Sequence, residues 1–216
     1  MQPKTSRTIC ELWDSAEPSD WEDALERYWC FVLPRNRDLE RPLDDLDLER
    51  LRHLDARGWY SFLHDEYFRW KYTAPNRYAT TTRWLHFYEE DQHTLADLDQ
   101  IRQRLLTLNT DDIRSGLQVA CRIRGLGTSG ASGLLALMYP QRFGTADQFV
   151  VKALRQIERL PEAAALRRLN PEGLTIRDAT MIVEILRRKA AENNRAFNVD
   201  TWTPRKIDKV LWTYGR

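Results

Sequence analysis

One acidic residue is set apart by its neighbours, because a loop rich in Gly and Pro precedes it and an apolar helical pattern follows it. Asp147 lies in YPQRFGTADQFVVKAL, where Pro140 to Gly144 predict the loop and Phe149, Val150 and Leu154 repeat at helical spacing. A carboxylate in such a place can stabilise a positive charge that develops during a reaction, or activate a water molecule. Asp is also a common helix N-cap, so its position alone leaves a purely structural role equally open.

A glycine-rich turn precedes this acid, in the segment IRGLGTSGASGLL. We expect Gly125 and Gly127 to adopt positive φ, which most other residues reach only at a cost. The amides of Gly125, Leu126 and Gly127 would then be bare beside the N-terminus of a helix that begins near Thr128, where they suit a phosphate oxygen. Leu126 is expected to anchor the turn in the core, and the small residues that follow predict close packing of the two hairpin helices. A plain tight turn between packed helices is the alternative.

The elements that must position these residues are predicted to be helices throughout, so the fold class is all-α. No segment shows the sustained alternation of a strand bounded by hairpin turns. Ser19 and Glu22 form a capping box, Thr94, Thr110, Thr175 and Thr203 are predicted to start further helices, and residues 35–42 are predicted to form a polar loop. The patterns predict helices near residues 19–33, 43–58, 59–72, 77–90, 94–106, 110–121, 128–138, 147–154, 175–194 and 203–214.

The hairpin and the acid after it together resemble the helix-hairpin-helix DNA glycosylases, in which a hairpin grips the DNA backbone and a catalytic Asp heads a later helix. The family pattern is similar to V-D-T-H-V-x-R-V, and the match covers about residues 113–157. The resemblance implies a two-lobed helical domain over residues 1–216, with the hairpin at about 113–138 and the catalytic loop and helix at about 140–157. It implies that Asp147 is catalytic. The residues implied to contact the DNA backbone are Gly125, Leu126, Gly127, Thr128 and Ser129.

The departures from the family pattern narrow the expected activity. Bifunctional members carry a nucleophilic lysine two residues past the second glycine of the hairpin, and Ser129 stands there in this chain. This predicts a monofunctional enzyme that leaves an abasic site without strand cleavage. The iron–sulfur cysteines of endonuclease III are missing, and Gln148 and Phe149 differ from the usual Thr-His pair. WKYTAPNRYATTT and TPRKIDKVLWTYG resemble a group of bacterial proteins, similar to the 8-oxoguanine glycosylases, whose substrate the sequence does not identify.

A base that reacts in such a site must leave the DNA stack, and extruded bases are held between aromatic or apolar faces. Most aromatic residues are expected in the core, because they share helical spacing with other apolar residues. WKYTAPNRY is the best pocket or wedge candidate, since polar and aromatic residues cluster there beside a proline. The candidate pocket residues are Trp70, Lys71, Tyr72, Asn76, Arg77, Gln148 and Trp202. The basic residues of 187–189 and Arg205, Lys206 and Lys209 are candidates for phosphate contacts, or a solvated helix face.

The 216 residues have a net charge of +1, but the charges are unevenly spread. From Cys121 onward, 17 Lys and Arg face 9 Asp and Glu, whereas the first 120 residues hold 16 against 23, so the C-terminal half can offer a basic face to a polyanion. The three scattered cysteines and four histidines predict no disulfide framework and no metal site. No cofactor is expected, other than a monovalent cation at the hairpin carbonyls.

The absence of a signal-peptide pattern and of a long apolar run predicts a cytoplasmic protein without a membrane partner. The resemblance implies a bacterial protein that acts on double-stranded DNA, and a monomer is expected. Two alternatives stay open. The chain is either a non-catalytic helix-hairpin-helix protein that only binds DNA, or an all-α interaction protein without a nucleic-acid partner. The excised base is not identified by the sequence, and neither is the choice between genome repair and defence against modified phage DNA.

Overall fold

The computed structural model describes residues 7–216, and every regular element in that part of the chain is helical, which confirms the all-α prediction. Most elements are α-helices; a π-helical segment, η1, and a 3₁₀ segment, η2, continue two of them. The elements are α1 (Ile9–Trp13), α2 (Pro18–Phe31), α3 (Pro34–Asp44), α4 (Leu48–Arg52), α5 (Ala56–Ser61), η1 (Phe62–Tyr67), α6 (Phe68–Lys71), α7 (Pro75–Leu85), η2 (His86–Glu89), α8 (Gln92–Leu106), α9 (Ile113–Ala120), α10 (Thr128–Met138), α11 (Gln148–Leu154), α12 (Ala163–Arg168), α13 (Ile176–Phe197) and α14 (Pro204–Gly215).

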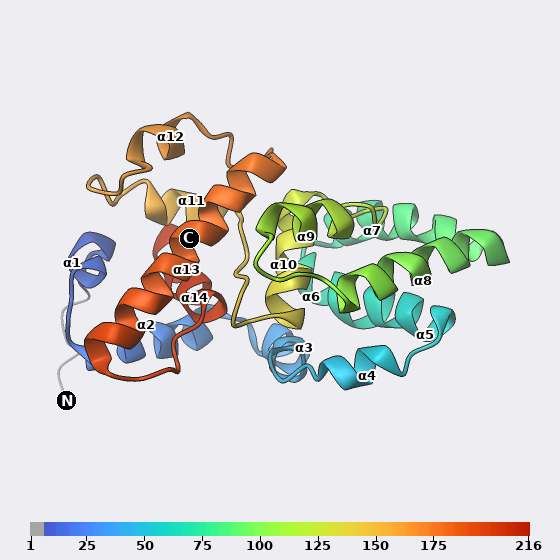
Figure 1. The fold of residues 1–216 in the computed structure, drawn as a ribbon, viewed down its shortest axis with the longest axis horizontal. Coiled ribbons are helices and arrows are strands. Elements are labelled where there is room, and N and C mark those ends of the chain that lie inside the picture. Colours follow the sequence, from blue (N-terminus) through green and yellow to red (C-terminus); the bar gives the residue numbers. More distant parts are fainter. Residues whose placement is uncertain (1–6) are drawn as a thin grey trace.

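The helices form two groups that lie side by side (Figure 1). The central group holds α3 to α10, with α5 and α9 packed against α8. The terminal group holds α1, α2 and α11 to α14, and in it α14 packs against α2, α11 and α13. The terminal group therefore combines both ends of the described chain, while the central group is formed by the segment between them. Helices α9 and α10 also contact α13, which joins the two groups.

The position of α11 depends on the close approach of α14. Thr203 caps α14 by accepting a hydrogen bond from the Lys206 amide at 3.2 Å, and Pro204 occupies the first position, where a missing N–H costs nothing. Near the other end of α14, a Cβ on Gly215 would collide with the carbonyl oxygen of Phe149. Glycine at this position therefore allows α14 to lie directly against the first turn of α11, which Asp147 precedes.

Several predicted boundaries are confirmed, and two segments differ from the prediction. Helices begin as predicted after Asp147, Thr175 and Thr203, and α10 covers the predicted range. Residues 35–42, predicted as a loop, belong to α3, because Pro34 starts a helix at its first position and the helix buries Glu40 and Leu43. The helix predicted over 43–58 is interrupted between α4 and α5.

The remaining differences concern helix starts. The predicted capping box at Ser19 lies inside α2, which begins at Pro18. Helices α8 and α9 are capped by Asp91 and Asp112 instead of the predicted threonines, because each carboxylate accepts a hydrogen bond from an amide in the first turn.

Within residues 7–216, no helix is both long enough and apolar enough to cross a lipid bilayer. The prediction that the N-terminus carries no signal peptide depends partly on residues 1–6, which lie outside the described residues.

Candidate active site

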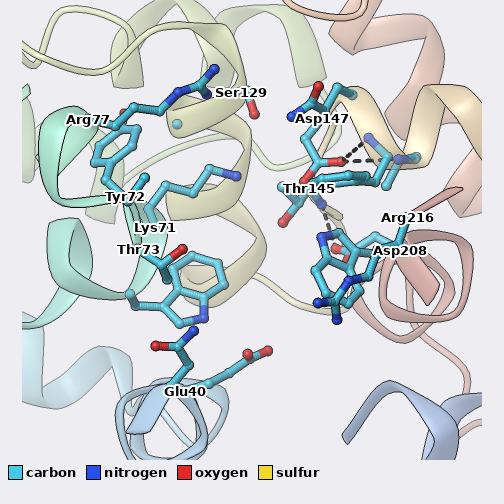
Figure 2. A pocket seen from close by; sticks show the side chains of 18 of the residues that line it. Glu40, Lys71, Tyr72, Thr73, Arg77, Ser129, Thr145, Asp147, Asp208 and Arg216 are labelled. Atoms are coloured by element: carbon cyan, nitrogen blue, oxygen red, sulfur yellow. Dashed lines mark hydrogen bonds between the residues drawn. The ribbon is translucent and has the colours of Figure 1, made fainter. Parts of the chain in front are cut away.

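A cavity of about 850 Å³ lies where the two helical groups meet, within the range of about 300–1,000 Å³ that is common for small-molecule pockets. Figure 2 shows its opposite walls: Lys71, Tyr72 and Arg77 on one side, and Asp147 and Asp208 on the other. The hairpin contributes Gly125, Gly127, Ser129 and Gly130 to the lining. The pocket thus brings together the hairpin, the acid and the WKYTAPNRY segment, which the sequence singled out separately.

Asp147 uses one carboxylate oxygen as a helix cap and leaves the other one available. Its Oδ1 accepts hydrogen bonds from the amides of Phe149, at 2.9 Å, and Val150, at 3.1 Å. Its Oδ2 accepts no hydrogen bond from the described residues, and the side chain borders the pocket (Figure 2). The two amides fix the orientation of the carboxylate, so the N-cap role and a chemical role are compatible in one residue.

The loop before Asp147 is held by a buried carboxylate. The Thr145 amide donates to Asp208 Oδ2 at 2.6 Å, and Asp208 is 2% exposed. Burial raises the pKa of Asp208 to about 6, because the cost of desolvation outweighs the attraction of Arg205 and the hydrogen bond from Thr145. The Thr145 hydroxyl is buried and has no hydrogen-bond partner among the described residues, although Thr145 lines the pocket.

A buried ionic cluster connects the two helical groups beneath the pocket. Arg205 of α14 contacts Glu40 of α3 at 2.7 Å and Asp208 at 2.9 Å, and Lys209 pairs with Asp44 of α3. The solvated helix face considered for Arg205 and Lys209 was wrong, because both side chains are buried within this cluster. A phosphate contact by Arg205, which lines the pocket, stays a prediction. Basic spacing on a helix does not distinguish a solvated face from one that meets buried acids on another helix.

Lys71, at the end of α6, extends from the opposite wall toward the side that carries Asp147 (Figure 2). Its ammonium group makes no hydrogen bond or ion pair with the described residues, although its side chain is partly buried. Its Nζ lies 5.8 Å from the centre of the Trp70 ring, which also lines the cavity. Burial lowers the pKa of Lys71, whereas the nearby charges of Asp147 and Asp208 act in the opposite direction. The cavity thus holds an amine and a carboxylate oxygen that both lack a hydrogen-bond partner among the described residues.

The hairpin differs from the prediction in two details. Gly125 has a φ of 89°, as expected, and a Cβ there would lie 2.5 Å from the carbonyl oxygen of Thr81. Gly127 has a φ of −78° and a ψ of 178°, so the positive φ predicted for it was wrong; it is in an extended conformation that any residue adopts. The Leu126 amide donates to the Ile123 carbonyl at 3.0 Å and is not bare, but its side chain is buried as predicted.

The open part of the hairpin is the start of α10. A Cβ on Gly127 would meet nothing within 4 Å, and no side chain caps α10. Helices α9 and α10 pack against each other as predicted, and two glycines of α10 also face a second neighbour. A Cβ on Gly130 would lie 2.6 Å from the Tyr72 hydroxyl, and one on Gly133 would lie 2.9 Å from the Tyr67 hydroxyl. Glycine therefore lets α10 pack against η1 and α6, the segment that carries Lys71.

Of the predicted pocket residues, only one lies elsewhere. Trp70, Lys71, Tyr72, Asn76, Arg77 and Gln148 line the cavity. Trp202 does not; it is 6% exposed and packs in the core against Trp21, with ring centroids 5.6 Å apart. Of the predicted backbone contacts, Thr128 starts α10 outside the pocket lining. The sequence-based prediction missed several lining residues on α2, α3 and α14 and directly after α14: Phe31, Glu40, Asp208 and Arg216. Of these, only Asp208 carried a signal, its spacing of three from Arg205.

The basic segment 187–189 also has a structural use. Arg187 donates to the backbone carbonyl of Thr110 at 2.6 Å, and Lys189 donates to that of Trp13 at 2.7 Å. Arg188 forms an ion pair with Glu162 at 2.9 Å. These side chains join α13 to neighbouring segments, so the prediction of phosphate contacts here has no support in the packing.

The residues that the structure describes contain no group of three or more His, Cys, Asp or Glu side chains that could hold a metal ion. The Ile123 and Gly125 carbonyls each accept a hydrogen bond, from the Leu126 amide and the Tyr72 hydroxyl, and the monovalent cation at the hairpin stays a prediction.

Comparisons of the chain with known protein families, with curated proteins and with solved structures found no match. The function is therefore inferred from the residues that meet in the pocket.

Proposed function

We propose that this protein is a DNA N-glycosylase, which hydrolyses the bond between deoxyribose and a damaged or modified base turned out of duplex DNA. The observation that carries the proposal is the position of Asp147: its unpaired Oδ2 borders a cavity that the glycine hairpin also lines. The sequence resemblance to helix-hairpin-helix glycosylases concerns these same two features.

The chemistry needs a fixed negative charge next to the sugar. When a base leaves, positive charge develops on the deoxyribose, and a carboxylate that is already oriented stabilises this state or activates the attacking water. Asp147 meets this requirement because the amides of Phe149 and Val150 hold Oδ1 at 2.9 and 3.1 Å. Little reorientation is then needed during the reaction.

The walls offer surfaces for a base that has left the stack. Trp70 and Tyr72 line one side and Phe149 and Trp212 line the other, so aromatic rings border the cavity from both helical groups. Extruded bases are held by such faces. The open amides at the start of α10 are next to the same cavity and suit a backbone phosphate, which would position the nucleotide without reading its sequence.

The alternative is a protein that uses the hairpin only to bind DNA. Gly127 is exposed, and a Cβ at this position would meet nothing within 4 Å, which favours phosphate contact whether or not the pocket is catalytic. DNA binding without abasic-site formation would favour this alternative, and the absence of DNA binding at low salt would favour an interaction protein instead.

The test is an excision assay on duplexes that each carry one modified base, followed by alkali to cleave abasic sites. We expect cleavage at one or a few modified bases by the wild type and its near-complete loss in Asp147→Asn. Asp91→Asn is the matched control, because Asp91 caps α8 in a similar way and does not line the pocket. A wild type that forms no abasic sites across a broad panel, or an Asp147→Asn variant with normal activity, would contradict the proposal.

A further inference from the structure

We infer that Lys71 is a nucleophile of this site, and that its amine forms a covalent imine with the sugar carbon C1′. This inference rests on the proposed function and changes one expectation from the sequence. Ser129 occupies the position at which bifunctional glycosylases carry a lysine, which predicted an enzyme without lyase activity. The structure brings an amine to the same part of the pocket from another helix.

The first step of the inference is the location of the amine. Ser129 and Gly133 are separated by one turn on α10, so they lie on the same face of that helix. A Cβ on Gly133 would lie 3.4 Å from Lys71 Nζ, which places the amine against this face, one turn below Ser129. Figure 2 shows the Lys71 side chain reaching into the space between Ser129 and Asp147. The amine of Lys71 thus lies beside Ser129, the position at which bifunctional glycosylases carry their nucleophilic lysine.

The second step is the lack of a hydrogen bond or ion pair that would fix this lysine elsewhere in the fold. Among the described residues, Lys71 is the only lysine that lines the cavity, and it has no hydrogen bond or ion pair there. Lys189, Lys206 and Lys209 each donate a hydrogen bond within the fold. Lys152 is exposed on α11. The Lys71 ammonium group contacts the Trp70 ring, which also lines the cavity, and no hydrogen bond or ion pair with the described residues ties it away from a molecule that enters the cavity.

The surroundings also favour the reactive, neutral form of the amine. Burial lowers the pKa of Lys71, and the positive charge of Arg205 acts in the same direction. Asp147, Asp208 and Glu40 oppose this change, and burial is the largest influence. A greater fraction of the amine is therefore neutral near pH 7 than for an exposed lysine, as a nucleophile requires.

The covalent step is balanced without any oxidant or cofactor. The lone pair of the neutral Lys71 amine attacks C1′, and the bond from C1′ to the base breaks, with the electron pair leaving on the base, which is protonated by water. The new ammonium loses one proton to Asp147, and the nitrogen lone pair then expels the ring oxygen O4′, which takes a proton. The product is a protonated imine. Loss of a C2′ proton next breaks the C3′–O bond to the 3′ phosphate, or water hydrolyses the imine and restores the lysine.

The experiment uses a duplex with a preformed abasic site, so it does not depend on the identity of the base. The ring-opened abasic sugar carries an aldehyde that condenses with an amine and releases water, and sodium borohydride reduces the resulting imine to a stable adduct. We expect the full-length wild type to give a protein–DNA adduct, and peptide mass spectrometry to locate it on Lys71. Lys71→Arg keeps the positive charge but is not nucleophilic, and we expect it to reduce trapping to background.

Lys152→Arg is the matched control and should be trapped like the wild type. An adduct mapped to Lys152 or to the terminal amine, equal trapping of Lys71→Arg, or no trapping of the wild type would each overturn the inference. Mapping of the wild-type adduct keeps the test valid if Lys71→Arg does not fold. The absence of a Lys71 adduct can be told apart from a failure of the proposed function. If water alone were the nucleophile, no Lys71 adduct would form, but base excision on the modified duplexes would persist.

Discussion

At the residue scale, the two oxygens of the Asp147 carboxylate have different environments, and one substitution separates their roles. Oδ1 accepts two amide hydrogen bonds from α11, whereas Oδ2 borders the cavity without a partner among the described residues. Asn keeps an oxygen that can cap the helix and replaces the other oxygen by a neutral amide. A cap role and a chemical role therefore predict different outcomes for the same variant.

We expect Asp147→Asn to lower the single-turnover rate of base excision by about 100-fold to 1,000-fold, or about 3–4 kcal/mol, because the fixed negative charge is lost. The melting temperature should change little, since Asn and Asp are both good N-caps. Asp147→Ala removes the cap as well and should cost about 1 kcal/mol of stability. Excision by Asp147→Asn at near wild-type rate would show that Asp147 is only a cap.

The protonation of Lys71 gives a second expectation at this scale. Because burial lowers its pKa, the rate of imine trapping on an abasic duplex should rise with pH and level off below the 10.5 that is ordinary for lysine. Asp147, Asp208 and Glu40 stabilise the ammonium form and Arg205 opposes it. Asp147→Asn removes one stabilising charge, so the midpoint should move to lower pH. A midpoint at or above 10.5, or a shift to higher pH in the variant, would contradict this assignment.

At the element scale, the two hairpin glycines have different roles. Gly125 allows a positive φ in the turn, and Gly127 leaves the amides at the start of α10 uncovered. Gly125 has a φ of 89°, and a Cβ there would approach the Thr81 carbonyl oxygen at 2.5 Å. Gly125→Ala should therefore lose about 1–2 kcal/mol from left-handed backbone strain, and more from that contact, as measured by urea unfolding. Gly127→Ala should be close to neutral, because its extended backbone suits any residue.

A substitution at Gly127 also tests DNA binding. Gly127→Val should fold normally yet weaken binding to duplexes of all sequences to a similar extent, since a bulky side chain would cover the open amides at the start of α10. Binding of the wild type should also weaken as salt is added. Unchanged DNA affinity of a folded Gly127→Val variant would exclude the hairpin from the binding site.

The elements near the hairpin could be predicted from sequence because their signals are local. A cap followed by apolar residues at helical spacing identified α10, α11, α13 and α14. The charged segment with Pro34 and Pro42 suggested a loop, yet it forms α3, because Glu40 is buried by partners on other helices: Tyr28 and Arg205. Likewise, Lys71 was found as a pocket candidate, but its lack of a hydrogen-bond partner depends on distant packing that no local pattern reveals.

At the scale of the whole molecule, the ionic cluster around Arg205 holds the central and terminal groups together. Arg205 is 6% exposed and pairs with Glu40 of one group and Asp208 of the other. Arg205→Ala would leave two buried carboxylates without this partner, which typically costs about 3–5 kcal/mol. The measurement is the free energy of unfolding in urea.

Arg188→Ala provides the control for this expectation. Arg188 pairs with Glu162 at 2.9 Å, but its side chain is 42% exposed, so its loss should cost less than about 1 kcal/mol. If both variants were equally stable, the cluster would not contribute to the contact between the groups. Reduced excision by Arg205→Ala would follow from the same cause, because Asp208 holds the Thr145 amide near Asp147.

The terminal group combines helices from both ends of the described chain, and this arrangement affects how the protein folds during translation. Its helix α2 is translated before the central group, yet it packs against α14, which is translated after that group. While the ribosome is still adding residues 32–203, the helices of the central group can already pair locally, whereas α2 lacks the helix against which it packs most. The wall that carries Asp147 is completed only when α14 has emerged. Until then, α2 is the segment that needs protection from aggregation.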